Sequence, residues 1–390
     1  MMRISGCFLS DPALLAVLDL IEAAGHRALL VGGAVRNAAL GEPISDIDIA
    51  TDARPERVSE LAAAAGLKPV PTGIEHGTVT VVSRGTGFEV TTFRRDVETD
   101  GRRAVVAFSD RIEEDAQRRD FTMNALYATR DGQVIDPVGG LDDLAARRVR
   151  FVGDAAARIR EDYLRILRFF RFHAWYGREV DPDALAACTL FGRGLDLISK
   201  ERIGAEMRKL LAAPDPSESL MLMREAHLLS KRVLPGADPR LMPALVAAEI
   251  GAGYPPVWAR RLALLGGDDV AGHLRLSRDE AKTQAQLAKA LAADWSLDEA
   301  GYRLGSDAGV DVALIAAARG AVLPDGWQAR IAAAADATLP ISAADLMSEL
   351  DGPALGRGLR AAEDAWIGSG FTLAPADLIE QALAAGKARP

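Results

Sequence analysis

At 390 residues and a formal net charge of −9, the chain is too long for one ordinary hydrophobic core, so we expect two or three domains. Hydrophobic residues make up 49% and charged residues 26%, which is typical of a globular protein and excludes an intrinsically disordered one. No apolar run reaches the roughly 20 residues of a membrane span, and the first residues lack the apolar core of a signal peptide. We therefore expect a cytoplasmic protein without membrane contact.

Cysteine and histidine usage indicates neither a disulfide framework nor a metal centre of these residues. Cys7 and Cys188 lie far apart without CxxC spacing, and the five histidines form no HExxH motif. Residues 147–209 contain fourteen Lys and Arg against nine Asp and Glu, although the whole chain is acidic. This excess is compatible with a phosphate-binding surface or with solvated helix faces.

Helix and strand patterns alternate over the first 150 residues. Asp11 and Pro12 are typical of a helix start, and Gly25 is typical of its end. Ala28–Val31 is then predicted to be a short buried strand.

The next strand is predicted over Ile44–Ala50, where polar and apolar residues alternate. This alternation places Asp46 and Asp48 on one face. A further helix and the two strands of a hairpin are expected over Pro55–Ala65, Thr78–Ser83 and Phe88–Phe93.

A change of character follows in the middle of the chain. The polar stretch Arg94–Arg103 is predicted to be a mobile loop that interrupts the sheet before Ala104–Phe108 resumes it. Beyond about residue 150 nearly everything is predicted to be helical, rich in Ala, Leu and Arg. We therefore expect a head over residues 1–150, a helical neck over 151–215, and a helical body and tail over 216–390.

Residues after the first predicted strand and on the second are suited to bind a phosphate and a metal ion. Gly32 and Gly33 permit close approach of the backbone to a phosphate at a helix start, and Arg36 can supply a charged fork to a triphosphate. Asp46 and Asp48 provide the hard oxygen ligands that Mg²⁺ prefers. Together these residues predict a nucleoside triphosphate site with bound metal.

Glu89 is our candidate for a third carboxylate. A two-metal transfer reaction holds its ions about 3.5–4 Å apart and normally uses three carboxylates. Glu89 lies on a predicted strand, on the face opposite Phe88 and Val90. No spacing rule connects Glu89 with the two aspartates, so a solvated glutamate on an edge strand remains the alternative.

Several stretches in chain order resemble the signature motifs of one enzyme family. They are GGAVRNAALGEPISDIDIAT, GIEHGTVTVV, FEVTTFRRD, DAQRRDFTMNALY, EDYLRILRFFRF and ISKERI. They are similar to the motifs of the class II CCA-adding tRNA nucleotidyltransferases and the bacterial poly(A) polymerases. The resemblance implies an α+β fold, with a DNA-polymerase-β-like nucleotidyltransferase head that contains a small mixed sheet, followed by an all-helical neck, body and tail. The family usually has Asp at the position of Asn37, a difference that concerns a local ion pair and not the metal site.

The resemblance also assigns nucleotide contacts to the stretch DAQRRDFTMN. Arg119 matches a residue that contacts the sugar and phosphates of the nucleotide. Asp120 and Asn124 are suited to test for a ribose 2′-hydroxyl by hydrogen bonding. An alternative for Asp120 is a helix cap.

The stretch EDYLRILRFFR is predicted to form one amphipathic helix. At about 100° per residue Asp162, Arg165, Arg168 and Arg171 share a polar arc. In the family the matching Asp and first Arg read the base edge. An Asp that accepts from an exocyclic amine and an Arg that donates to a ring nitrogen fit cytosine and adenine, and reject uracil and guanine. Arg171 lies about 180° from Asp162, so we expect Arg168 and Arg171 to contact phosphate or primer instead. A basic solvated helix face is the alternative.

The resemblance further implies a product. Family members that add only CC tend to lack part of the flexible loop, whereas Asp100, Arg102 and Arg103 are present here. We therefore expect addition of C, C and A to the 3′ end of tRNA, from CTP and ATP, with two Mg²⁺ ions. The body and tail are expected to contact the acceptor and elbow of the tRNA, and no protein partner is inferred. The alternatives are a poly(A) polymerase, an enzyme that adds only A or only CC, and a catalytically silent RNA-binding module.

Overall fold

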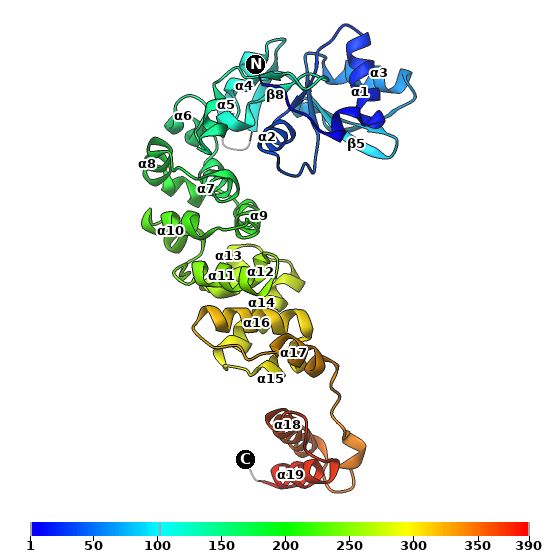
Figure 1. Cartoon of the computed structure of the whole chain (residues 1–390), viewed down its shortest axis with the longest axis vertical. Helices are drawn as coiled ribbons and strands as arrows, with labels where there is room; N and C mark the ends of the chain where they lie inside the picture. Colours follow the sequence, from blue (N-terminus) through cyan, green and yellow to red (C-terminus); the bar gives the residue numbers. More distant parts are fainter. Residues whose placement is uncertain (1, 101–102, 389–390) are drawn as a thin grey trace. The chain divides into compact units, whose positions relative to one another are not determined.

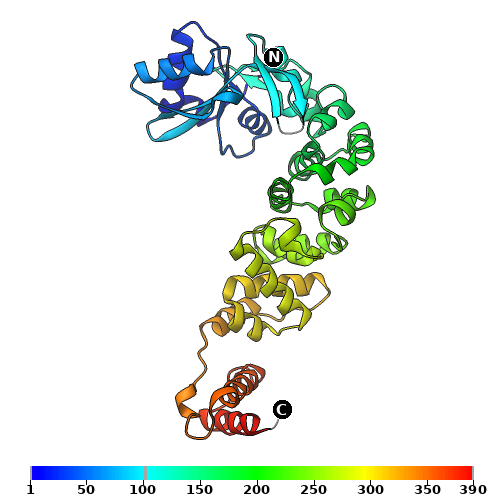
Figure 2. The same cartoon turned by 180° about the vertical axis from the view of Figure 1, so that it is seen from behind.

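The computed structural model describes residues 2–100 and 103–388, in two compact units. Unit 1 is Met1–Val233 and unit 2 is Leu234–Pro390. Figures 1 and 2 show strands in the first part of the chain and helices thereafter. The three-part division into head, neck, and body with tail stays a prediction.

The centre of unit 1 is a seven-stranded sheet with the strand order β3-β4-β5-β2-β1-β8-β9. Strands β2 and β5 pair in parallel, and every other neighbouring pair is antiparallel. The predicted small mixed sheet is therefore confirmed. The strands are β1 (Ala28–Val31), β2 (Asp48–Thr51), β3 (Lys68–Gly73), β4 (Thr78–Ser83), β5 (Thr86–Thr92), β8 (Tyr127–Ala128) and β9 (Val134–Ile135).

The predicted strand over Ile44–Ala50 is shorter than expected. Strand β2 begins at Asp48, and Asp46 lies in the segment that precedes it. The cause is the partner strand: Val31 pairs with Asp48, and the chain then turns away at Gly32, which has a φ of 69°. On that side of β2, residues 44–47 therefore have no strand with which to continue the ladder, although β5 extends to Thr86 on the other side.

The predicted loop over Arg94–Arg103 is wrong as a secondary-structure assignment. Strands β6 (Arg94–Asp100) and β7 (Arg103–Phe108) form an antiparallel sheet of two strands, separate from the main sheet (Figure 2). A two-stranded ribbon need not bury either face, so polar residues do not distinguish it from a loop. Its predicted mobility stays a prediction, and Arg102 lies outside the described residues.

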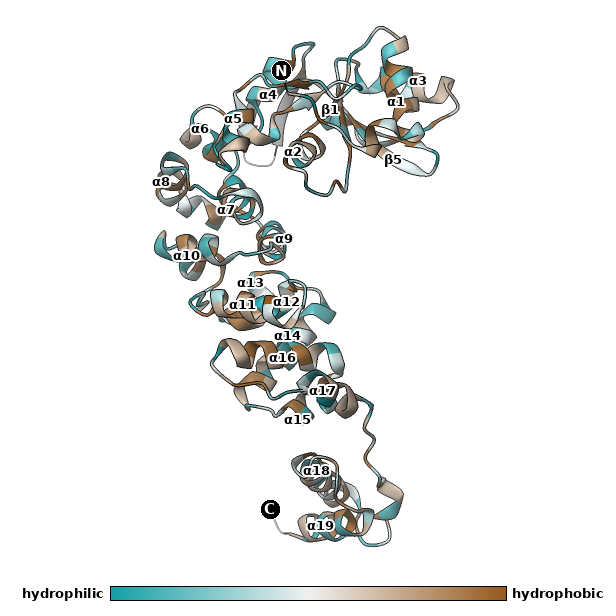
Figure 3. Ribbon diagram, in the orientation of Figure 1, coloured by the Kyte–Doolittle hydropathy of each residue, from teal (hydrophilic) through white to brown (hydrophobic). Residues whose placement is uncertain are grey.

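The helices of unit 1 pack on the sheet and then on one another. Helices α1 and α3 contact each other and strand β4, and strand β1 is apolar along its length (Figure 3). Asp11 caps α1 as predicted, because its carboxylate accepts a hydrogen bond from Ala13 N at 2.8 Å. The helices are α1 (Pro12–Ala23), α2 (Gly33–Leu40), α3 (Pro55–Ala64), α4 (Ile112–Gln117), α5 (Gly140–Ala145), α6 (Ala155–Glu161), α7 (Leu164–Tyr176), α8 (Pro182–Leu190), α9 (Lys200–Leu211) and α10 (Ser217–Glu225).

Helix α7 is the core of the helical part of unit 1. Its buried side chains include Ile166, Phe169 and Phe170, and it contacts α9 and α10. On its other side Arg168 donates to Asp120, and Arg171 donates to Glu206 of α9.

The described part of unit 2 contains helices and no strands. Helix α16 is buried along most of its length and contacts α11, α12, α14, α15 and α17. None of the described helices is long and apolar enough to cross a membrane. The helices are α11 (Met242–Ala252), α12 (Trp258–Leu265), α13 (Val270–His273), α14 (Arg278–Ala292), α15 (Leu297–Leu304), α16 (Ser306–Ala318), α17 (Trp327–Asp336), α18 (Gly352–Gly368) and α19 (Pro375–Lys387).

Candidate active site

Two cavities in unit 1 meet at the aspartate pair. One, of about 350 Å³, is the arginine pocket, and its lining includes Gly32, Gly33, Arg36, Asp46, Asp48, Arg119, Asp120, Asn124, Arg168 and Arg171. The other, of about 600 Å³, is the carboxylate pocket, lined by Asp46, Asp48, Glu89 and neutral residues together with Asp11. Ser45, Asp46 and Asp48 line both. Two reactants bound in these cavities would meet at the carboxylates.

The sheet places Glu89 beside the aspartates. Strands β2 and β5 run in parallel with Asp48 opposite Glu89, and Glu89 is exposed between buried Phe88 and Val90. Burial and then the neighbouring charge of Glu89 raise the pKa of Asp48, against the opposing effect of Arg119. The carboxylates therefore crowd one another in a way that a cation would relieve.

Within residues 2–100 and 103–388, no three His, Cys, Asp or Glu side chains converge closely enough to hold a metal by themselves. Mg²⁺ commonly takes only one or two protein carboxylates and completes its shell with water and substrate phosphates. The pair Asp46 and Asp48 fits that mode of binding, and Glu89 lies next to it in the register.

The turn at Gly32 brings the backbone into the arginine pocket. A side chain would be strained at its φ of 69°, and a Cβ there would lie 3.6 Å from Arg119 Nη1. Helix α2 begins at Gly33, so free backbone N–H groups and the positive end of the helix point into the same cavity.

Arg36 is buried in the arginine pocket by neighbours on three elements. Its Nη2 donates to the Tyr176 hydroxyl at 2.9 Å, its Nη1 donates to Asn124 Oδ1, and its guanidinium lies 4.1 Å from the centre of the Tyr176 ring. Burial lowers the Arg36 pKa, with Tyr176 acting against it. Asn37 Oδ1 accepts from Arg36 Nε at 3.1 Å, so the amide keeps the hydrogen bond of an Asp without its charge.

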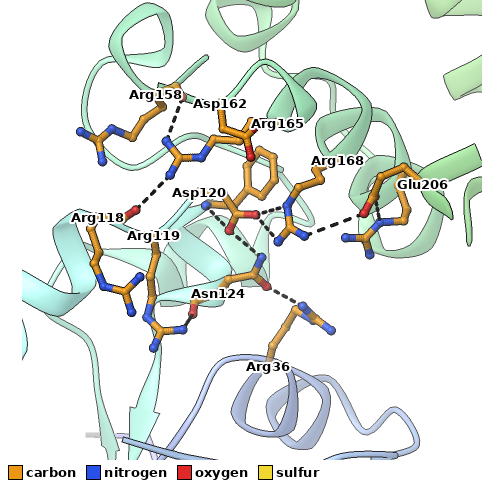
Figure 4. A network of polar contacts seen from close by, with 12 residues as sticks. Arg36, Arg118, Arg119, Asp120, Asn124, Arg158, Asp162, Arg165, Arg168 and Glu206 are labelled. Carbon is orange, nitrogen blue, oxygen red and sulfur yellow. Dashed lines mark hydrogen bonds and ion pairs between the residues drawn. The ribbon is translucent and has the colours of Figure 1, made fainter. Parts of the chain in front are cut away.

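Asp120 and Asn124 form one hydrogen-bonded network with the arginines of α7 (Figure 4). Asp120 Oδ2 accepts from Arg168 Nε at 2.7 Å, and its Oδ1 accepts from Asn124 Nδ2 at 3.1 Å. Burial alone would raise the Asp120 pKa, but Arg168 and the hydrogen bonds outweigh it and lower it to about 2. On the far side, Glu206 of α9 accepts from Arg171 Nε at 2.6 Å.

Three arginines surround a single aromatic ring in the arginine pocket. The guanidinium groups of Arg36, Arg168 and Arg171 lie 5.3, 5.4 and 4.0 Å from the centre of the Phe172 ring. The ring face offers each cation a weak attraction while the cations repel one another. Such a cluster favours an anion with several charges.

The expected base-reading pair is not in this pocket. Asp162 Oδ2 accepts from Arg202 Nη2 at 2.6 Å, and Arg165 Nη1 donates to Glu161 Oε2 at 2.5 Å. Neither Asp162 nor Arg165 is among the residues that line the arginine pocket, although both lie near its network in Figure 4.

The predicted single helix from Glu161 is also wrong. Helix α6 ends at Glu161, Asp162 has extended backbone angles, and α7 begins at Leu164. The break arises because Asp162 Oδ1 accepts from Leu164 N at 3.0 Å, as a helix-starting Asp does. Asp162 is therefore not part of the same helix as the arginines, and the angle of about 180° predicted between Asp162 and Arg171 is wrong. Arg168 and Arg171 do line the arginine pocket.

Sequence reasoning missed five residues that shape the site. Asp115 and Tyr127 bind Arg119, Tyr176 and Phe172 carry the arginine cluster, and Glu206 pairs with Arg171. A signal existed for Asp115 only, because it stands three and four residues before Arg118 and Arg119. The side chains of Asp100, Arg102 and Arg103 lie outside the described part of the chain.

Two family models match unit 1 and the beginning of unit 2. The family described as Poly A polymerase head domain matches residues 28–150, and the one described as Probable RNA and SrmB- binding site of polymerase A matches residues 177–241. A CCA-adding enzyme of Leuconostoc citreum is 48% identical over 222 residues, which cover 56% of this chain and 54% of that enzyme. The chain thus spans about half the length of the curated relatives it matches.

Solved structures match over nearly the whole chain. The Bacillus stearothermophilus CCA-adding enzyme in complex with CTP has a TM-score of 0.75 and 31% identity, covering 92% of each chain. The Thermotoga maritima CCA-adding enzyme complexed with tRNA_CCA has a TM-score of 0.68 and 19% identity, covering 98% of this chain and 99% of that one, and shows the fold alone.

Proposed function

The chain belongs to the family of class II tRNA nucleotidyltransferases and bacterial poly(A) polymerases, and from this premise we propose that it adds C, C and A to the 3′ end of tRNA. The substrates are CTP and ATP, and pyrophosphate is released. The observation that carries the proposal is the meeting of an arginine pocket and a carboxylate pocket at Asp46 and Asp48. The similar enzyme with bound CTP supports the nucleotide assignment.

The triphosphate binds in the arginine pocket. Arg36, Arg119, Arg168 and Arg171 supply charge, and the turn at Gly32 supplies backbone N–H groups. Asp120 and Asn124 lie in the same cavity, where they are placed to accept from and donate to a ribose hydroxyl.

Asp46 and Asp48 hold Mg²⁺, with Glu89 as the third carboxylate. Bound Mg²⁺ lowers the pKa of the attacking hydroxyl and neutralises charge on the leaving pyrophosphate. Glu89 faces the carboxylate pocket, where it takes up the proton of the primer 3′-hydroxyl.

The primer end enters the carboxylate pocket. Apart from its acidic groups this cavity is lined by Ser45, Thr80, Thr86 and other neutral side chains. Among the residues that the structure describes, no Lys or Arg lines this cavity, so it suits a ribose with free hydroxyls better than a triphosphate.

Asp162 and Arg165 select the base. Their present partners, Arg202 and Glu161, must release them before they bind a base edge. A base that offers an amine beside a ring-nitrogen acceptor replaces both partners at once, whereas uracil and guanine offer the wrong pattern. The helices of residues 216–390 contact the acceptor and elbow of the tRNA. The cytoplasmic location stays a prediction.

The test uses tRNA transcripts that end before CCA, after C and after CC, each with one labelled triphosphate. We expect C on the first two and A on the third, with no product from UTP or GTP. If the protein adds long A tails to unrelated RNA, it is a poly(A) polymerase and the proposed CCA addition is wrong. We expect the variants Arg102→Ala and Arg103→Ala to lose A addition and keep C addition. If A addition and C addition fall equally, this segment does not control the switch from C to A.

A further inference from the structure

A second group of polar side chains surrounds Asp115 and adjoins the arginine pocket through Arg119. Asp115 of α4 is 1% exposed and binds three donors. Tyr127 Oη donates to its Oδ2 at 2.7 Å, Arg119 Nη2 donates to the same oxygen at 2.9 Å, and Arg118 Nε donates to Oδ1 at 2.8 Å. Of these residues only Arg119 lines the arginine pocket.

The guanidinium of Arg119 is held by two residues along one edge and by a single long hydrogen bond along the other. Nε lies 3.3 Å from Asp115 Oδ2 and 3.2 Å from the Tyr127 hydroxyl, on the same side as Nη2. Nη1 points the other way, toward the turn at Gly32, and is 3.4 Å from Asn124 O. Asp115 and Tyr127 therefore fix the plane of the fork, and Arg119 lines the pocket in that orientation.

Tyr127 connects this fork to the strand that carries the turn. It lies on β8, opposite Val31 of β1, and Gly32 follows directly. Its ring is fully buried and meets Phe93 edge to face at 6.4 Å. The phenol and the Gly32 turn thus rest on one pair of strands, which fixes Arg119 relative to the backbone N–H groups.

We propose that Asp115 and Tyr127 are positioning residues for the triphosphate, which hold Arg119 in the orientation that binds phosphate together with the Gly32 turn. Neither residue touches substrate. A fork fixed before binding loses little rotamer freedom when the phosphate arrives, whereas a free arginine loses more. This inference rests on the proposed function.

The charges agree with this geometry. Burial alone would raise the Asp115 pKa, but Arg119 and Arg118 outweigh it and hold it at about 2, so Asp115 is ionised at neutral pH. One carboxylate against two guanidinium groups leaves positive charge for a phosphate. Burial raises the pKa of Tyr127, so its hydroxyl remains a donor to Asp115.

The test is the substitution Tyr127→Phe, which removes one hydroxyl and no carbon atoms. We expect the KM for ATP and CTP, and the inhibition constant of inorganic tripolyphosphate, to rise about three- to tenfold with kcat changed less than twofold. Tyr302→Phe is the matched control, because this tyrosine of unit 2 also bonds to a carboxylate, Glu363, at 3.1 Å. Its KM values are expected to equal those of the wild type.

A double-mutant cycle shows whether the effect passes through Arg119. Arg119→Lys keeps the charge and loses the fork, so adding Tyr127→Phe to it is expected to change KM no further. Asp115→Asn is expected to raise KM more than Tyr127→Phe, with thermal unfolding confirming that each variant is folded. An unchanged KM in Tyr127→Phe, or an effect that persists beside Arg119→Lys, overturns the inference. A wild-type protein that incorporates no nucleotide overturns the proposed function itself.

Discussion

Arginine networks occur in both units, buried in unit 2 and mostly half-buried in unit 1, and they differ in charge balance. In unit 2, Glu249 accepts from Arg260 and Arg261, and Asp311 accepts from Arg260 at 2.7 Å. In unit 1 the site network contains five arginines and three carboxylates, namely Arg36, Arg118, Arg119, Arg168, Arg171, Asp115, Asp120 and Glu206.

Paired charges inside a protein can hold the fold together or bind a ligand, depending on their balance. In unit 2 the two carboxylates match the two arginines, both of which are at most 2% exposed, and the pairs join α11, α12 and α16. In unit 1 the surplus of positive charge lines a cavity beside Asp46 and Asp48. A balanced network holds helices together, whereas an unbalanced one that faces a cavity requires an anionic ligand.

The largest effect that would separate the two networks is expected from Asp48→Ala. Nucleotide addition should fall by about a thousandfold or more, because a metal ligand is lost. Stability should not fall, because the substitution relieves a half-buried carboxylate crowded by Glu89. Addition assays and thermal unfolding measure the two effects, and normal addition by this variant would refute the metal site.

Glu249→Gln is the converse change in unit 2. It leaves Arg260 and Arg261 buried without their shared carboxylate, so we expect a loss of about 3–5 kcal/mol in the free energy of unfolding. The KM for ATP and CTP should stay that of the wild type below the unfolding temperature. Urea unfolding and addition kinetics provide the readouts. A raised KM at unchanged stability would mean that the unit 2 network serves substrate binding after all.

Acid should affect the two networks in opposite directions. The Asp115 pKa of about 2 lies below the ordinary value, so its contribution of about 2 kcal/mol is present above about pH 4 and is lost as the pH falls toward 2. Burial raises the pKa of Asp311 against the effect of Arg260, so its protonation stabilises the fold as the pH falls. Unfolding free energies from pH 6 to 2.5 should show the gap between wild type and Asp115→Asn narrowing. In the same experiment wild type should gain stability relative to Asp311→Asn as the pH falls, because only wild type takes up the stabilising proton.

The smallest effect is expected from Asn37→Asp, which restores the residue usual in the family. A charge-assisted bond to Arg36 is gained, but the donor from Asn37 Nδ2 to Pro43 O at 2.6 Å is lost. We expect stability to change by less than about 1 kcal/mol and KM by less than about twofold. A tenfold change in KM would show that the charge on Arg36 limits triphosphate binding.

Local patterns predicted much of the head correctly. Strand β1, helix α3 and the hairpin of β4 and β5 follow from apolar alternation, a proline at a helix start and a glycine-containing turn. The wrong secondary-structure predictions concern segments whose strand character depends on whether a partner strand is present. Residues 44–47 alternate like a strand but have no partner, and β6 is polar but pairs with β7.

The same distinction applies to the site: residues with a characteristic local spacing could be predicted, and residues brought in by distant segments could not. The glycine pair, Asp46 and Asp48 could be predicted because their spacing along the chain is itself the signal. The role of Glu206 could not, because it lies 35 residues from Arg171 and reaches it only through the packing of α7 on α9. The same holds for Tyr127, whose hydroxyl meets Asp115 through the sheet.

From the sequence we could predict carboxylates suited to a metal, arginines suited to a triphosphate, and a helical region that follows a mixed sheet. Residue type and short spacing suffice for that, because they reflect the local geometry of strands and helices. The packing of distant segments was needed to show which arginines share a cavity with Asp48, and which of them are held by Asp115, Asp120 and Glu206. These contacts depend on strand register and on helix packing between distant segments, and burial strengthens each hydrogen bond because the local dielectric constant is low.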